Sequence, residues 1–198
     1  MDKYQSIAGP SEGFLRDRGS KFLAYAFPVD TEKDIHEGLD KVRQLHPKAR
    51  HHCYAYRLGT DGNNFRANDD GEPSGTAGKP ILGRIDSFEL TNVLVVVVRY
   101  FGGTLLGASG LIRAYKQSTA DALEQAKIIE RTVEDIYSLA FDYSQMSTVM
   151  NAISRFELEM VEKRFGDTAE VDVAIRKSDV NSILRQIKAS VADVYLEV

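Results

Sequence analysis

Four glycines follow an apolar run in a pattern that brings polypeptide backbone close to an anion. Val93–Val98 is uninterrupted apolar sequence, and Gly102, Gly103, Gly107 and Gly110 lie between it and a helical pattern. Glycine adopts positive φ and admits close contact, and the free N–H groups at a helix start favour a phosphate or carboxylate. The pattern predicts an anion site, although the same glycines also suit a tight strand-to-helix turn. It is not a Walker A loop, since no Gly-Lys-Ser/Thr follows at the required spacing.

Basic side chains surround this glycine loop in the sequence. Arg99 precedes it, Arg113 and Lys116 follow it, and an arginine can bind a phosphate through two parallel hydrogen bonds. Arg50 leads into a strand-like segment that begins with two histidines, one of which we expect to face the same groove. The residues predicted to bind an anion or RNA, besides the four glycines, are Arg50, His51, His52, Arg99, Arg113 and Lys116.

A second loop, Asn68–Gly78, is acidic. Clustered carboxylates can hold a divalent cation or act as acid and base, but the glutamate that ends a calcium EF-hand loop is missing. Asp and Ser side chains more often bond their own backbone, and we favour this interpretation, with one carboxylate paired to Arg99 or Arg113. The loop residues expected beside the anion site are Asp69, Asp70, Glu72, Ser74 and Thr76.

The run His51-His52-Cys53 does not predict a metal site. Side chains alternate along a strand, so His51 and Cys53 share one face while His52 takes the other. Zinc would need further ligands, and the remaining histidines lie in a predicted helix. Cys53 lies in mid-strand, without the activation that a thiol nucleophile needs. We predict no metal, no cofactor and no catalytic residue, and we expect Ser109 to be a helix N-cap.

Hydrophobic periodicity predicts the elements that position these residues. The predicted strands of the first part are Lys21–Phe27, His51–Leu58, Phe65–Ala67 and Val93–Tyr100, the last of them buried on both faces. Three helices are predicted in this part. The first has its N-cap at Thr31 and ends before Pro47, the second has its N-cap at Thr76 and extends to Ile85, and the third begins after Gly110.

The pattern changes near Arg131. From there the predicted order is β-α-β-β-α-β, the ferredoxin-like arrangement. Its predicted strands are Ile136–Tyr143, Leu158–Phe165, Ala169–Ile175 and Val191–Val198. We therefore predict an α+β protein of two domains, residues 1–132 and 133–198.

Composition excludes several classes of protein. No segment has the roughly 18 apolar residues of a membrane span, and the first residues lack the apolar segment of a secretory signal. The lone cysteine fits a reducing compartment, so we expect a soluble cytoplasmic protein with no membrane partner. The net charge is −4. The acidic excess lies beyond residue 130, and we do not expect that part to bind nucleic acid by bulk charge.

Four segments together resemble the Impact family, which includes bacterial YigZ-type proteins and eukaryotic Impact translation regulators. They are Ser20–Ala24, Ala49–Tyr56, Asn68–Gly78 and Val97–Tyr115, and the resemblance extends over essentially the whole chain. It implies an N-terminal α/β sandwich similar to the second domain of a ribosomal small-subunit protein, followed by a ferredoxin-like domain. That pairing resembles consecutive domains of elongation factor G, which contact ribosomal RNA. Eukaryotic members carry an additional N-terminal interaction domain and compete for an activator of the amino-acid-starvation kinase, and we do not carry that partner over.

The leading hypothesis is a non-enzymatic regulator associated with translation, which binds RNA, the ribosome or another anionic partner through its N-terminal domain. The alternative is a small-molecule or nucleotide-binding enzyme that uses the glycine loop with Asp69, Asp70 and Glu72, since clustered ionisable groups often mark catalysis. A third hypothesis is that the sheet of the C-terminal domain binds a regulatory protein. The sequence does not identify a ligand or an oligomeric state.

Overall fold

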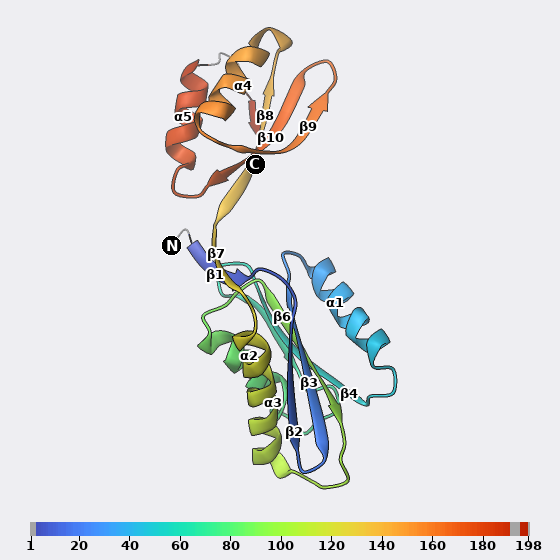
Figure 1. Ribbon diagram of the computed structural model, residues 1–198. Helices are drawn as coiled ribbons and strands as arrows, with labels where there is room; N and C mark the ends of the chain where they lie inside the picture. Colours follow the sequence, from blue (N-terminus) through green and yellow to red (C-terminus); the bar gives the residue numbers. More distant parts are fainter. Residues whose placement is uncertain (1–2, 191–194, 198) are drawn as a thin grey trace. The chain divides into compact units, whose positions relative to one another are not determined.

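The computed structural model describes residues 3–190 and 195–197. The chain divides into two compact units, an N-terminal unit, Tyr4–Arg131, and a C-terminal unit that starts at Thr132. Figure 1 shows the elements of both units. Each unit combines helices with an antiparallel sheet, which confirms the predicted fold class.

The N-terminal unit contains seven strands and three helices. In chain order they are β1 (Lys3–Ile7), β2 (Ser11–Asp17), β3 (Ser20–Pro28), α1 (Glu32–Leu45), β4 (His51–Leu58), β5 (Asn64–Asn68), α2 (Gly78–Ser87), β6 (Val93–Tyr100), α3 (Gly107–Glu124) and β7 (Ile128–Thr132). The sequence did not predict β1, β2 or β7.

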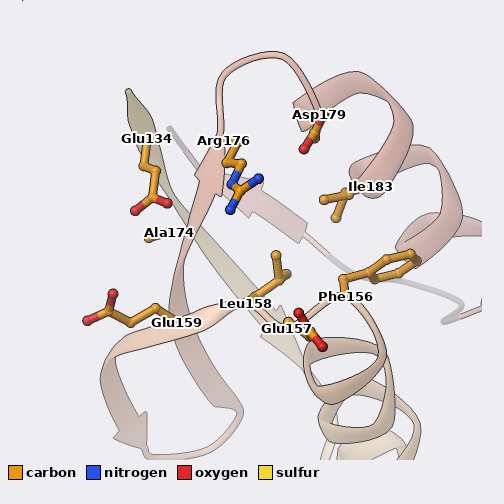
Figure 2. Close-up of a pocket in the computed structure, with 9 residues that line it drawn as sticks. All are labelled: Glu134, Phe156, Glu157, Leu158, Glu159, Ala174, Arg176, Asp179 and Ile183. Atoms are coloured by element: carbon orange, nitrogen blue, oxygen red, sulfur yellow. The ribbon is translucent and has the colours of Figure 1, made fainter. Parts of the chain in front are cut away.

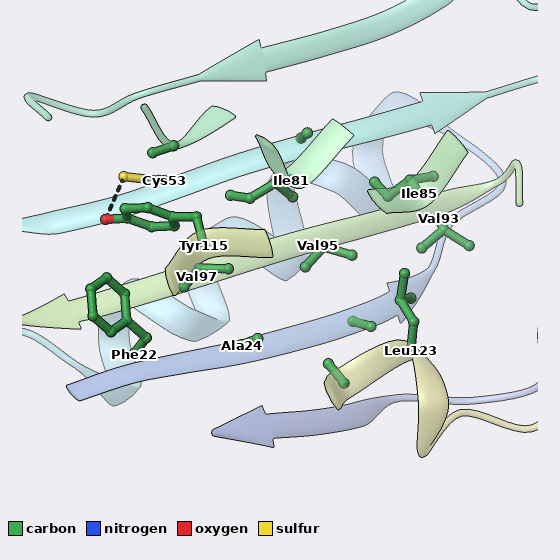
Figure 3. Packing of buried hydrophobic residues seen from close by; sticks show 14 of the residues in the cluster. Phe22, Ala24, Cys53, Ile81, Ile85, Val93, Val95, Val97, Tyr115 and Leu123 are labelled. Carbon is green, nitrogen blue, oxygen red and sulfur yellow. Dashed lines mark hydrogen bonds between the residues drawn. The ribbon is translucent and has the colours of Figure 1, made fainter. Parts of the chain in front are cut away.

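The main sheet of this unit has the strand order β2-β3-β6-β4-β5, so β6 lies at its centre. Val93–Val98 is fully buried, because helices cover both faces of the sheet (Figure 1). On one face Val93, Val95 and Val97 pack with α2 and α3, while on the other Leu94, Val96 and Val98 pack with α1. Figure 3 shows the first of these layers. The alternating valines therefore fix which helix covers which face.

The helix α1 begins as the sequence predicted. The Thr31 hydroxyl accepts the Asp34 N–H, and the Asp34 carboxylate accepts the Thr31 N–H in return, which completes a capping box. Ile35, Leu39 and Val42 then face the sheet at helical spacing. The helix ends at its C-cap, His46. The His46 ring contacts the Tyr100 hydroxyl, so this end of α1 lies near the end of β6, where the glycine loop begins.

A short two-stranded sheet joins the ends of the unit. Strand β1 pairs with β7, and the Ala8 N–H donates to the Lys127 carbonyl at 2.8 Å. The first and last strands of the N-terminal unit are therefore neighbours in space.

The C-terminal unit has the predicted ferredoxin-like order. Its elements are β8 (Glu134–Phe141), a 3-10 turn (Tyr143–Gln145), α4 (Met146–Arg155), β9 (Glu159–Phe165), β10 (Ala169–Arg176), α5 (Val180–Ser190) and β11 (Tyr195–Glu197). The strand order is β11-β8-β10-β9, and the apolar side chains of β8 and β10 pack against α4 and α5. Of the predicted last strand, Val191–Val198, the residues other than Tyr195–Glu197 lie outside the described part. In the described ranges, no helix has the length and apolar content to cross a membrane.

Candidate functional site

The acidic loop closes on its own backbone around Asp69. The Asp69 carboxylate accepts hydrogen bonds from the N–H groups of Gly75, Ala77 and Gly78 at 2.8, 3.0 and 2.8 Å. Burial opposes ionisation of this carboxyl, but the three backbone hydrogen bonds prevail and lower its pKa. Two of the donors lie at the start of α2, so Asp69 caps that helix from a distant position in the sequence.

Two helix caps predicted from the sequence are therefore wrong. Thr76 donates its hydroxyl to the Pro73 carbonyl at 2.6 Å, and the N-cap of α2 is Ala77. Ser109 lies inside the first turn of α3, whose N-cap is Leu106. In both cases the helix begins at a residue other than the one after the predicted cap, and the side-chain hydroxyl does not cap the helix.

Asp70 joins the acidic loop to the start of β4. Its Oδ2 accepts the His52 N–H at 2.6 Å, and its carbonyl oxygen lies 2.9 Å from His51 Nδ1. The His52 ring is buried, with Nε2 3.2 Å from the His46 carbonyl. Asp70 itself has a φ of 39°, a conformation that few residues other than glycine adopt. Both histidines thus hold the loop in position.

Glu72 brings a negative charge into the interior. Its two oxygens lie 2.7 and 2.9 Å from Arg99 Nη1, and Tyr115 donates its hydroxyl to Oε1 at 2.9 Å. The Glu72 and Arg99 side chains are 3% and 8% exposed, so both charges are withdrawn from water. Arg99 is therefore engaged within the chain, and a phosphate would have to displace Glu72 to reach it.

Cys53 contacts the same tyrosine hydroxyl as Glu72. Its Sγ is 3.0 Å from the Asp69 carbonyl and 3.3 Å from Tyr115 Oη (Figure 3). Desolvation raises the pKa of the Cys53 thiol to about 12, and burial also raises the pKa of Tyr115. Both groups stay protonated at neutral pH, so neither is prepared to act as nucleophile or base.

The structure brings His51, His52 and Arg99 together with the acidic loop, but Arg113 lies elsewhere. Arg113 Nη2 is 3.0 Å from Asp17 Oδ2, at the end of β2. The expected pairing of one acidic-loop carboxylate with Arg99 or Arg113 is therefore confirmed for Arg99, which binds Glu72, and is wrong for Arg113. The groove expected from the sequence separates into a buried cluster around Arg99 and an exposed region around Arg113.

The glycine loop packs against the turn between β2 and β3. A Cβ atom at Gly102 would lie 1.9 Å from the carbonyl carbon of Gly19, and the Gly102 N–H donates to Ser20 Oγ at 3.1 Å. Gly103 and Gly107 have φ angles of 88° and 70°. These three glycines are required by the path of the backbone, as the tight-turn interpretation holds.

A hollow of about 130 Å³ opens at the N-terminus of α3. We call it the α3 hollow; it is lined by Asp17, Arg18, Leu106, Ser109, Gly110 and Arg113. Helix α3 has no acidic residue in its own first turn and no side-chain hydrogen bond at its N-cap among the described residues, and the Asp17 carboxylate that lines the hollow is paired with Arg113. Arg18 is exposed and makes no ion pair among the described residues.

A second, larger hollow of about 430 Å³ lies beside the first, at the start of β3 and the end of β6. We call it the aromatic hollow; it is lined by Gly19, Lys21, Leu23, His46, Tyr100 and Phe101. Sequence reasoning missed Arg18, Lys21, Tyr100 and Phe101 as site residues. Basic and aromatic residues at the start of β3 and at the end of β6 could have indicated this site from the sequence. The two segments are far apart in the chain, however, and they become neighbours only because Lys21 pairs with Tyr100 in the sheet.

The remaining predicted residues lie around these features. Arg50 precedes β4, Lys116 lies one turn after Arg113 on α3, and both side chains are exposed. Ser74 is exposed in the acidic loop, whereas Gly110 is buried in the first turn of α3. No role follows for Ser74 from these contacts.

The C-terminal unit has a hollow of about 290 Å³ of a different character. Figure 2 shows four carboxylates around Arg176, together with apolar side chains; the carboxylates are Glu134, Glu157, Glu159 and Asp179. Its excess of negative charge disfavours an anionic ligand. In the part of the chain that the structure describes, no cluster of His, Cys, Asp or Glu is arranged to hold a metal ion.

Comparison with known proteins gives consistent matches. Residues 18–123 match the family of the Impact N-terminal domain. The IMPACT family member YvyE of Bacillus subtilis is 34% identical over 182 residues, which cover 92% of this chain and 84% of that protein. A solved structure described as a crystal structure of an hypothetical protein superposes with a TM-score of 0.80 at 29% identity, over 99% of this chain and 97% of that one. The two-domain translational regulator Yih1 is 28% identical, over 62% of this chain and 47% of its own, with a TM-score of only 0.36.

Proposed function

Because this chain belongs to the Impact family, we propose that it is a regulator associated with translation that binds RNA through the α3 hollow. The family resemblance motivates the translation role, and the described function of Yih1 agrees with it. We also propose a cytoplasmic location, where ribosomes are found.

The observation that carries the proposal is the charge around the start of α3. The uncapped helix N-terminus and two exposed guanidinium groups, Arg18 and Arg113, border one small hollow. A phosphate there would accept hydrogen bonds from arginine and would lie at the positive end of the helix. Lys116 is also exposed, one turn further along α3, and Arg50 is exposed just before β4, whose first residue pairs with Arg99 of β6.

The anion-binding residues that we propose differ in part from those that the sequence suggested. Arg99 is excluded as a first phosphate contact, because its guanidinium is buried against Glu72. Arg18 takes its place, on the turn that packs against Gly102. The glycine loop then serves to bring this turn and the start of α3 together.

The small-molecule enzyme is the weaker hypothesis. It rested on free carboxylates beside the glycine loop, but Asp69 and Asp70 accept backbone hydrogen bonds and Glu72 is paired with Arg99. The pKa of Asp69 is lowered rather than raised, Glu72 is buried in its ion pair, and Asp70 is tied to the backbone of β4, so the three carboxylates are used to hold the loop. We therefore do not propose a catalytic role for them.

Fluorescence anisotropy with a short labelled oligouridylate, measured over a series of salt concentrations, tests the proposal. If about three cationic groups contact phosphates, log affinity should fall with log salt with a slope of about −2. Arg113→Ala should weaken binding and reduce the slope by about 0.7, which is one phosphate contact. Arg43→Ala is the matched control, since Arg43 is an exposed arginine that also pairs with an aspartate, Asp40, at 3.4 Å.

A second variant is expected to increase the affinity for RNA instead of lowering it. Asp17→Asn removes the one carboxylate that lines the α3 hollow and competes for Arg113, so it should tighten binding. Absence of binding to RNA and to purified ribosomes, or an equal loss of affinity in the Arg113 and Arg43 variants, would exclude the proposed site.

A further inference from the structure

The aromatic hollow adds a second kind of contact to the same end of the molecule. Building on the proposed RNA binding, we propose that this hollow holds one unstacked nucleobase, so that the ligand is single-stranded RNA and not a duplex. Its volume, about 430 Å³, lies in the range of sites that enclose small organic groups.

The walls of the aromatic hollow are those that a base requires. Phe101 is 59% exposed and lines the hollow, so part of its ring is open to a ligand, and Tyr100 lines the hollow beside it. Lys21 contributes a positive charge from the adjacent strand. Proteins that bind single strands combine aromatic rings, on which bases stack, with cationic groups along the backbone.

The rings are also held in position before any ligand arrives. The Tyr100 hydroxyl lies 3.0 Å from His46 Nδ1, and the Tyr25 hydroxyl lies 2.7 Å from His46 Nε2. The Arg99 guanidinium lies 5.6 Å from the centre of the Phe101 ring and is itself fixed by Glu72. A preformed platform lowers the entropy lost on binding. The buried ion pair thus supports the exposed ring.

The two hollows are adjacent, and this favours a polyanion over an apolar peptide side chain. Arg18 lines the α3 hollow and Gly19 lines the aromatic hollow, and neighbouring Cα atoms are only about 3.8 Å apart. One strand can therefore set a phosphate against Arg18 and Arg113 while the base of a neighbouring nucleotide enters the aromatic hollow. Paired bases are stacked inside a duplex and cannot do so without being extruded.

The experiment compares a single-stranded oligoribonucleotide with a blunt duplex of the same length, and includes a 2-aminopurine at one position of the single strand. Phe101→Ala should weaken single-strand binding roughly 5- to 150-fold, the effect of losing one stacked base. Phe101→Tyr should retain affinity. Leu105→Ala is the control, since Leu105 is 82% exposed on the same loop but lines neither hollow.

The wild-type protein should quench 2-aminopurine fluorescence on binding, and Phe101→Ala should abolish the quenching while circular dichroism stays unchanged. Equal affinity for single strand and duplex, with no quenching, would overturn the base site and leave the proposed RNA binding intact. If the wild-type protein binds neither form, both the base site and the proposed function are rejected. Quenching by the wild-type protein alone still decides the question should the Phe101 variants fail to fold.

Discussion

Replacing Glu72 by Gln should strongly destabilise the N-terminal unit. The variant keeps the size of the side chain and an oxygen that can accept from Tyr115, but it removes the one charge that pairs with buried Arg99 among the described residues. The remaining guanidinium would stay in the interior without a counter-charge. Arg99 Nε is already buried and has no hydrogen-bond partner in the part of the chain that the structure describes, so little spare polar contact exists to compensate.

The expected cost is about 3 to 5 kcal/mol, the usual effect of removing one partner of a buried ion pair. That is a large part of the roughly 5 to 15 kcal/mol that stabilises a typical domain. Adding Arg99→Met to the variant should recover much of the loss, because a buried pair is often replaceable by apolar groups of similar volume. The double variant is therefore expected to be more stable than Glu72→Gln alone.

Native-state hydrogen exchange of the β6 amides measures this quantity for the N-terminal unit alone. These amides lie in the centre of the sheet and exchange through global opening of the unit. The loss of stability in Glu72→Gln should exceed the loss that Arg164→Met causes in the C-terminal unit. Arg164 contacts three carboxylates, but these ion pairs are largely exposed to water and contribute little. A loss below about 1 kcal/mol for Glu72→Gln, or no recovery in the double variant, would contradict the reasoning.

Two further substitutions test the loops that frame the site. Asp69→Asn should lower the free energy of unfolding by about 1 kcal/mol at neutral pH, as the loss of a helix cap does. Because folding lowers the pKa of Asp69, the stabilisation by its carboxylate is present above about pH 4 and is lost as the pH falls through the folded pKa. The melting temperatures of the variant and the wild-type protein should therefore converge in acid. Gly102→Ala should prevent the packing of the glycine loop on the β2–β3 turn and lower the melting temperature, whereas Gly83→Ala, in a helix with open space around it, should raise it slightly. Melting curves in which the two alanine variants shift alike would be inconsistent with the packing described.

The strongest patterns in the sequence predicted the fold well. The apolar run Val93–Val98 required cover on both faces and is the central strand, and the Thr31 capping box and the C-terminal alternation of strands and helices are where they were expected. These features depend on local periodicity and local hydrogen bonds. They need no knowledge of the tertiary structure.

Elements that depend on distant contacts could not be predicted in this way. Strand β2 carries charged residues and Gly13, which look unsuited to a strand. Gly13 is required there because a Cβ would lie 2.3 Å from the Ala122 backbone nitrogen of α3, a contact that only the folded chain creates. The pairing of Arg113 with Asp17 and the capping of α2 by Asp69 are further cases. Arg113 and Asp17 are 96 residues apart, and Asp69 lies outside the helix that it caps, so neither contact follows from the local sequence pattern.

The pairing of β1 with β7 has a consequence for how the N-terminal unit can be combined with other sequences. The polypeptide enters and leaves this unit at one point, because its first and last strands are hydrogen-bonded neighbours. Domains with adjacent ends tolerate insertion into longer chains and circular permutation. The unit can therefore be transferred as a cassette, and a host chain need supply only two closely spaced attachment points to accommodate it.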